Sequence, residues 1–187
     1  MKTTTHSPAT PRAGKPKLTA PFRVTEAPAP DVIELVPRMM SIREILVPID
    51  FSATSLKSLQ YAVPFAKQFD AKLTLVHVVE MPVYPESPYS VPLGPEELEA
   101  IKKELAQICA AKIPPEIPVE IAVRQNSVFE GILEVARENS TDLIITTTHG
   151  RTGLKHLVMG STAEDIVRRA PCPVLVVRER EHEFVEC

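Results

Sequence analysis

Short apolar runs alternate with stretches of helical periodicity along most of this 187-residue chain, and this alternation limits the possible folds more than any other feature. The apolar runs are short and rich in Val, Ile and Leu, as is typical of strands buried on both faces. We predict strands over residues 42–49, 72–79, 119–123, 142–146 and 174–177. We predict helices over residues 54–69, 95–112, 126–139 (capped by Asn126 or Ser127) and 161–170.

Strands that alternate with helices indicate right-handed crossovers and a parallel sheet with helices on both faces. We therefore expect an α/β fold built on an open five-stranded parallel sheet in the order 3-2-1-4-5. Ligands of such sheets bind beyond the carboxyl ends of the strands, where the strand order reverses. That point lies between the strand that leads to Asp50 and the strand that leads to Thr146, so these two strand ends should meet.

Prolines and a serine mark boundaries around the first predicted helix. Pro48 should end the first strand, because it has no N–H to donate to a ladder. Ser52 is a candidate N-cap. Pro64 lies inside the helix and is expected to kink or split it.

The first 38 residues differ in composition from the rest. They hold seven of the 19 prolines and carry six Lys/Arg against three Asp/Glu. Such a segment buries too little apolar surface to offset its ordering entropy, although the apolar residues 32–36 are candidates for contact with the domain. We predict a disordered Pro-rich extension over residues 1–38, a domain over 39–180 and a C-terminal tail over 181–187. A translation start at Met39 or Met40 is an alternative.

The composition excludes several classes of protein. A net charge of −3 argues against a nucleic-acid-binding surface. No apolar run approaches the roughly 20 residues needed to span a bilayer, so no membrane segment is expected. Cys109, Cys172 and Cys187 have no C-x-x-C spacing, which indicates a reducing, cytoplasmic compartment and no zinc site.

A strand, a glycine-containing loop and a helix start follow one another between Leu143 and Asp165. The loop contains Gly150, and Gly160-Ser161 opens the predicted helix. Unpaired N–H groups and the positive dipole end at a helix N-terminus form an anion site, so we interpret this stretch as a phosphate cradle.

Each cradle residue also has a purely structural interpretation. Gly150 and Gly160 allow the backbone close to a phosphate, or they supply positive φ at turns. Ser161 binds phosphate, or it is the N-cap of a capping box with Glu164 at N3, whose carboxylate would then compete with an anion.

The chain from Ser41 to Arg178 resembles the universal stress protein family. The resemblance rests on Ile45–Ser52, Leu75–Val79, Thr148–Gly153 through Gly160-Ser161, and Ala170–Val177. It implies a Rossmann-like fold of the adenine nucleotide alpha hydrolase type. Many members bind ATP through Gly-x-x-Gly, nine residues, then Gly-Ser or Gly-Thr. Here Gly150 and Gly160-Ser161 match, whereas Thr147 stands at the first glycine.

The resemblance also implies a nucleotide site. It assigns Asp50 and Val78 to the nucleoside end, although Asp50 is alternatively a cap for the Ser52 turn. The remaining implied pocket residues are Pro48, Thr146, Thr147, His149 and Thr162, beside Gly150, Gly160 and Ser161. Thr147 either narrows the pocket or contributes its hydroxyl. His77, inside an apolar strand, is interpreted as a core histidine.

The expected function is a cytoplasmic stress or signalling protein that binds ATP, with or without Mg²⁺, as a regulatory ligand. The alternative is a dimeric interaction module without nucleotide. A slow ATPase or autokinase is the weaker third possibility, because no Walker lysine motif, metal carboxylate pair or positioned base is found.

The last strand predicts a homodimer. Val174, Leu175, Val176 and Val177 would form an apolar edge strand with unpaired backbone groups. Antiparallel pairing with a twofold mate would satisfy both edges, and universal stress proteins commonly dimerise in this way.

Overall fold

A computed structural model of the chain describes residues 40–80, 92–148 and 159–178. Strands and helices alternate through these residues, as the apolar pattern predicts. They are β1 (Glu44–Pro48), α1 (Ala53–Phe69), β2 (Lys72–Val79), α2 (Pro95–Lys112), β3 (Val119–Gln125), α3 (Val128–Glu138), β4 (Leu143–Thr147), α4 (Ser161–Arg169) and β5 (Val174–Val177). The predicted extension over residues 1–38 and the tail over 181–187 lie outside the described residues.

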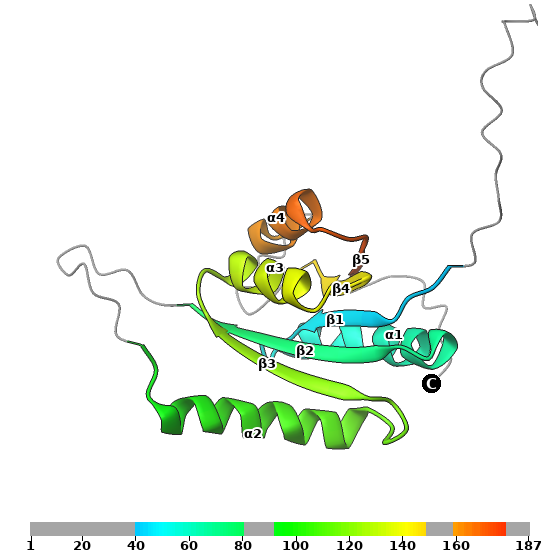
Figure 1. Ribbon diagram of the computed structural model, residues 1–187. Coiled ribbons are helices and arrows are strands. Elements are labelled where there is room, and N and C mark those ends of the chain that lie inside the picture. The colour runs from blue at the N-terminus through cyan, green and yellow to red at the C-terminus, as the bar shows by residue number, and fades with distance from the viewer. Residues whose placement is uncertain (1–39, 81–91, 149–158, 179–187) are drawn as a thin grey trace, which may run out of the picture. The chain divides into compact units, whose positions relative to one another are not determined.

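The five strands form one parallel sheet in the order β3-β2-β1-β4-β5, which confirms the predicted order (Figure 1). β1 lies at the centre, with Ile45 opposite Leu73 of β2 on one side and Leu143 of β4 on the other. β3 and β5 are the two edge strands. The chain therefore reverses its winding direction between β1 and β4.

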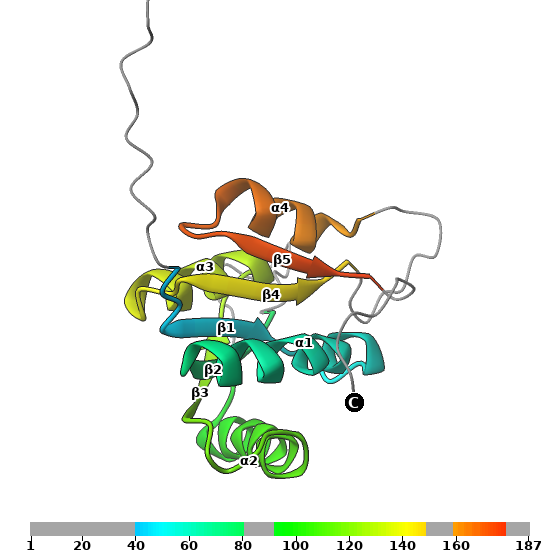
Figure 2. The ribbon, with the colours of Figure 1, turned by 90° about the vertical axis from the view of Figure 1, so that its right-hand side faces the viewer.

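Helices cover both faces of the sheet (Figure 2), so that alternate side chains of each strand enter different cores. Ile45 and Val47 pack into the core beneath α1 and α2. Leu46, between them, packs into the second core beneath α3 and α4. Among the residues that the structure describes, no helix has both the length and the apolar character required to cross a membrane.

Several predicted boundaries shift by one or two residues for a local reason. The strand predicted over 42–49 extends only from Glu44 to Pro48. The Asp142 carboxylate accepts hydrogen bonds from Arg43 N (2.7 Å) and Glu44 N (3.1 Å), so it joins the starts of the two central strands from outside β4. β3 continues beyond the predicted end, Val123, to Gln125.

The N-cap of α1 agrees with prediction, whereas a split of the helix at Pro64 does not occur. Ser52 Oγ accepts a hydrogen bond from Ser55 N at 3.0 Å, which confirms the N-cap. Pro64 does not split the helix, which runs unbroken to Phe69. The helical acceptor that Pro64 leaves without a donor is the carbonyl of Gln60, an exposed residue, so water is able to reach this region of the helix.

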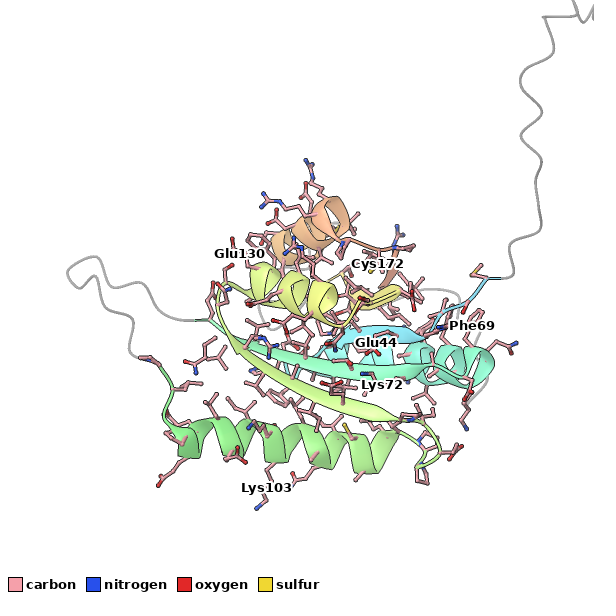
Figure 3. The ribbon with its side chains drawn as sticks, viewed as in Figure 1. Glu44, Phe69, Lys72, Lys103, Glu130 and Cys172 are labelled. Carbon is pink, nitrogen blue, oxygen red and sulfur yellow. The ribbon has the colours of Figure 1, made fainter. Side chains whose placement is uncertain are left out.

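A partly buried polar cluster joins the amino ends of the first three strands. Glu44, only 8% exposed, accepts a hydrogen bond from the Thr74 hydroxyl. Lys72 Nζ lies 3.2 Å from Glu44 Oε2 and 2.7 Å from Glu120 Oε2, and Figure 3 shows Lys72 beside Glu44. The hydrogen bond to Glu120 is the main cause that raises the pKa of Lys72, Glu44 raises it further, and desolvation opposes both.

Replacing Lys72 by Met should lower the free energy of unfolding by about 1–2 kcal/mol, because it leaves Glu44 buried without its cation. The value is below that of a fully buried pair, since the Lys72 side chain is 36% exposed and screened by solvent. Urea denaturation measures the change. Lys102→Met is the matched control: its partner Glu99 lies 2.7 Å away on an exposed helix face, so a change under about 0.5 kcal/mol is expected.

The same pair predicts a pH dependence. The pKa of Lys72 is higher in the folded protein than its ordinary value of 10.5, so its contribution is complete below that pH. It is lost as the pH rises through the raised pKa. The difference in stability between wild type and Lys72→Met should therefore shrink in alkaline solution, and a constant difference up to pH 12 would contradict this assignment.

Candidate functional site

A cavity of about 600 Å³ lies beyond the carboxyl ends of β1, β2 and β4, beside the first turn of α4. This is the point where the strand order reverses, and the volume suits a small-molecule ligand. Eight of the ten predicted site residues line this cavity: Pro48, Asp50, Val78, Thr146, Thr147, Gly160, Ser161 and Thr162. The other two, His149 and Gly150, lie outside the described residues. The structure thus brings residues from four separate segments to one place.

The start of α4 differs from the predicted capping box. Gly160, not Ser161, is the N-cap, and no side chain among the described residues caps this helix. Gly160 N donates to the Thr148 carbonyl at 2.8 Å. This hydrogen bond holds Gly160 at the start of α4, so the N-cap lies one residue earlier than predicted. Glu164 instead accepts from Arg168 Nη2 at 2.7 Å. The Glu164 carboxylate therefore does not occupy the N-cap position, and the first turn keeps N–H groups suited to an anion.

Glycine at position 160 is needed because the start of α4 lies close to the end of β4, and not because the backbone there has an unusual conformation. Its φ of −72° is one that any residue adopts, so the interpretation that Gly160 supplies positive φ is wrong. A Cβ built on it would lie 3.1 Å from the Thr148 carbonyl oxygen. Glycine thus lets β4 and α4 approach closely at the mouth of the cavity.

Three consecutive threonines, the last two residues of β4 and Thr148 after it, are all buried. Strand alternation places Thr146 on the face of Ile144, the face covered by α3 and α4. It places Thr147 on the face of Ile145, where α1 packs. The Thr147 side chain therefore takes up little space on the α4 side of the sheet. The main effect of having threonine instead of glycine at this position is to restrict the backbone conformation.

Asp50 sits in a tight turn between β1 and α1. Its Oδ1 accepts from Ser52 N (3.0 Å) and Ser52 Oγ (2.6 Å), so the predicted cap of the Ser52 turn is present. The next residue, Phe51, has φ 65°, a left-handed conformation that costs a non-glycine residue about 1–2 kcal/mol. Strain at this point, beside a cavity, is typical of a functional turn.

His77 has a partner in the core, as predicted, but it also lines the cavity. Its Nδ1 lies 2.7 Å from the Ile49 carbonyl oxygen, and its ring is buried. Sequence reasoning missed it as a cavity residue, along with Ser55, Glu80 and Thr148. Glu80 directly follows β2, so the rule that ligands bind at strand ends would have found it.

The electrostatics of the described lining are mixed. Asp50 and Glu80 contribute carboxylates, and no Lys or Arg is among the described residues that line the cavity. The positive character comes from the α4 N-terminus. Within ranges 40–80, 92–148 and 159–178, no group of three or more His, Cys, Asp and Glu side chains could hold a metal ion.

An apolar wall formed by β2 and α3 bounds the cavity opposite the polar groups. Val78 of β2 and Ile132 of α3 lie on it. Gly131 permits this contact, because a Cβ added there would lie 2.8 Å from Val78 Cγ1 and 3.3 Å from Arg124 Cβ. Because Gly131 has no side chain, Val78 can pack directly against the backbone of α3.

Together, a doubly wound parallel sheet, a cavity at its reversal point and a glycine-capped helix define a doubly wound α/β protein with a candidate ligand site at the carboxyl ends of its strands. A sequence profile of the universal stress protein family matches residues 41–178. The chain belongs to the universal stress protein family, and its fold is the Rossmann-like, adenine nucleotide alpha hydrolase-like fold of that family.

Individual relatives agree with this assignment. A universal stress protein of Methanocaldococcus jannaschii is 33% identical over 150 residues, which cover 75% of this chain and 85% of the relative. Among solved structures, the universal stress protein UspA from Lactobacillus plantarum superposes with a TM-score of 0.60 at 22% identity, covering 75% of this chain and all of the other.

Two further solved structures contain nucleotides. One is a universal stress protein in complex with cAMP, with a TM-score of 0.54, 21% identity, and coverage of 75% of this chain and 100% of the other. The second is the universal stress protein from Archaeoglobus fulgidus in complex with dAMP, with a TM-score of 0.54, 18% identity, and coverage of 74% and 98%. At these identities, the likeness establishes the shared fold.

Replacing Gly131 by Ala should destabilise the protein by about 1 kcal/mol, because overpacking against Val78 outweighs the better helix propensity of alanine. Urea denaturation tests this in two backgrounds. In Val78→Ala the obstructing methyl groups are gone, so Gly131→Ala should there be neutral or stabilising. The same loss in both backgrounds would show that Val78 is not the limiting contact.

Proposed function

We propose that the cavity binds an adenine nucleotide, ATP or a close relative, as a regulatory ligand in a stress or signalling role. The observation that carries the proposal is the pairing, in one cavity of about 600 Å³, of a helix N-terminus without a described side-chain cap and a carboxylate at the end of a central strand. The first suits phosphate, and the second suits sugar hydroxyls.

In this proposal, the phosphates lie at the first turn of α4. Ser161 and Thr162 offer backbone N–H groups and hydroxyl groups, and Gly160, whose own N–H donates to the Thr148 carbonyl, leaves space for the phosphates to approach. Thr146 and Thr147 lie beside them at the end of β4. His149 and Gly150 belong to the proposed site through their match to the family motif.

The nucleoside lies towards β1 and β2. Asp50 accepts from the sugar or base, and Pro48 and Val78 line this end. Ile132 and Val128 of α3 provide apolar surface for the base. The two relatives in complex with cAMP and dAMP support an adenine nucleotide as the ligand class. Within this class, we propose ATP as the ligand. Mg²⁺ would bind together with the ATP phosphates.

A cytoplasmic location, where ATP is abundant, is part of the same proposal. The free thiols of Cys109 and Cys172 are compatible with it. The proposed role is to bind the nucleotide and not to hydrolyse it efficiently.

One observation favours the second candidate, an interaction module without nucleotide. The described lining carries the carboxylates of Asp50 and Glu80 and no cationic side chain, and this arrangement disfavours a polyanion. Nucleotide analysis of gently purified protein separates the two functions. Stoichiometric adenine nucleotide supports the first, whereas nucleotide-free protein that does not bind millimolar ATP supports the second.

Gly160→Asp should weaken ATP binding at least tenfold, because a carboxylate at the N-cap accepts from the first-turn N–H groups and repels phosphate. Gly160→Asn is the matched control with nearly the same shape and no charge, so it should weaken binding less. Both variants place the same Cβ 3.1 Å from the Thr148 carbonyl oxygen and both side chains are good N-caps, so their free energies of unfolding should agree with each other to within about 0.5 kcal/mol. Calorimetric titration measures affinity, and equal affinities for wild type and Gly160→Asp would remove α4 from the site.

We also propose a homodimer formed by antiparallel pairing of β5 with its twofold mate. β5 is an edge strand whose residues Val174, Leu175 and Val176 are only partly buried in the single chain. Its neighbour β4 pairs with one side, and no strand among the described residues pairs with the other side, where a second copy would bind.

Val176→Asp should convert a dimer to a monomer, because it introduces a charge into the apolar contact at the proposed interface. Light scattering at micromolar concentration reports the mass. Val119→Asp, in the opposite edge strand β3, is the control and should leave the mass unchanged. A monomeric wild type would refute the dimer without bearing on nucleotide binding.

A further inference from the structure

Two neighbouring residues of β2, Val76 and His77, hold the backbone around Asp50. β1 ends at Pro48, and Ile49 N still donates to the Val76 carbonyl at 2.8 Å. The Ile49 carbonyl oxygen lies 2.7 Å from His77 Nδ1. A carbonyl oxygen can only accept, so Nδ1 carries the proton in this hydrogen bond. The His77 side chain therefore extends the attachment of the chain to β2 by one residue.

The same ring also contacts the residue after Asp50. The centroids of the Phe51 and His77 rings are 4.5 Å apart, with an angle of 43° between their planes. Phe51 holds the left-handed conformation, φ 65°, which a bulky residue adopts only when its surroundings impose it. The ring contact and the packing of Phe51 on the core both oppose relaxation of this turn.

The side chain of Asp50 is oriented separately. Its Oδ1 accepts from the backbone N and the hydroxyl of Ser52, and its own N donates to Ser55 Oγ at 3.3 Å. These contacts fix the orientation of the carboxylate relative to α1. They do not fix the turn relative to β2, on which the nucleoside end of the cavity is built. The hydrogen bond from Ile49 N to the Val76 carbonyl supplies part of this link, and His77, which contacts both Ile49 and Phe51, extends it to both sides of Asp50.

We infer that His77 is a positioning residue: it holds Ile49 and Phe51 in place and so sets the position of the Asp50 carboxylate in the cavity. The inference rests on the proposed function, because it concerns the affinity for the nucleoside part of the ligand. It goes beyond that function in assigning a role to a histidine that lies 28 residues from its partner and outside the nucleotide motif.

Two substitutions separate the hydrogen bond from the ring. His77→Leu fills the space without a donor and should weaken ATP binding about tenfold, the effect of losing one well-placed polar contact. His77→Asn keeps an N–H donor on Cγ, where Nδ1 stood, and should bind ATP within about threefold of wild type. Calorimetric titration gives the affinities. Should His77→Leu fail to fold, Phe51→Asn replaces it, because asparagine tolerates the left-handed turn and removes the ring contact with His77 together with the packing of Phe51 on the core; about threefold weaker binding is then expected.

A double-mutant cycle distinguishes positioning from direct contact with the ligand. If His77 acts through Asp50, the loss caused by His77→Leu should fall from about tenfold to less than about twofold in an Asp50→Ala background. An undiminished loss in that background would overturn the inference, and so would equal affinities of wild type and His77→Leu. Binding by His77→Asn as weak as that of His77→Leu would also overturn it.

If the protein does not bind adenine nucleotides at all, the experiment gives a different result. Wild-type protein would then show no ATP binding, and the cycle would have no starting value. Nitrogen NMR of the ligand-free protein still tests the geometry: Nδ1–H is the expected tautomer of the neutral His77 ring, and Nε2–H would overturn the assignment on its own.

Discussion

The pairing of β1 with β4 is the interaction on which the rest of the structure depends. The two strands are almost 100 residues apart in sequence, yet Ile45 lies opposite Leu143 and Leu46 opposite Ile144. Forming this pair requires the closure of a long loop before its contacts stabilise anything. Once formed, it reverses the winding of the chain, divides the helices between two faces, and brings the ends of β1 and β4 to one cavity.

The two ends of the sheet use polar groups in opposite ways. At the amino ends, Lys72 is paired with Glu44 and Glu120, and the Asp142 carboxylate accepts from two backbone N–H groups. Polar groups there satisfy one another, which supports stability. At the carboxyl ends, α4 begins at a glycine, and none of the described side chains caps it. Donors at that end remain suited to a ligand.

Much of the fold follows from local pattern, because two-sided burial demands continuous apolar strands and the alternation of elements dictates crossovers. The order of the strands and the Ser52 cap were predictable for this reason. The N-cap of α4 was not, because Gly160 is fixed by the carbonyl of Thr148, a contact between segments that only the folded chain brings together. The close contact between Gly131 and Val78 was not predictable either, because it depends on how α3 packs on the sheet. His77 looked like a core residue from its apolar neighbours, and strand periodicity cannot reveal that its ring reaches across to β1.

Two locally unfavourable features lie beside the cavity. Phe51 accepts a left-handed backbone, and Gly160 gives up a side-chain cap, both at the edge of the sheet that lines the cavity. Neither feature improves the folded state by itself: the first costs about 1–2 kcal/mol, and the second forgoes at most a few tenths of a kcal/mol relative to the best N-caps. The stabilising contacts lie elsewhere, in the two apolar cores and at the amino ends of the strands. Locally unfavourable features that persist beside a cavity are expected where a ligand, rather than the chain itself, completes the interactions.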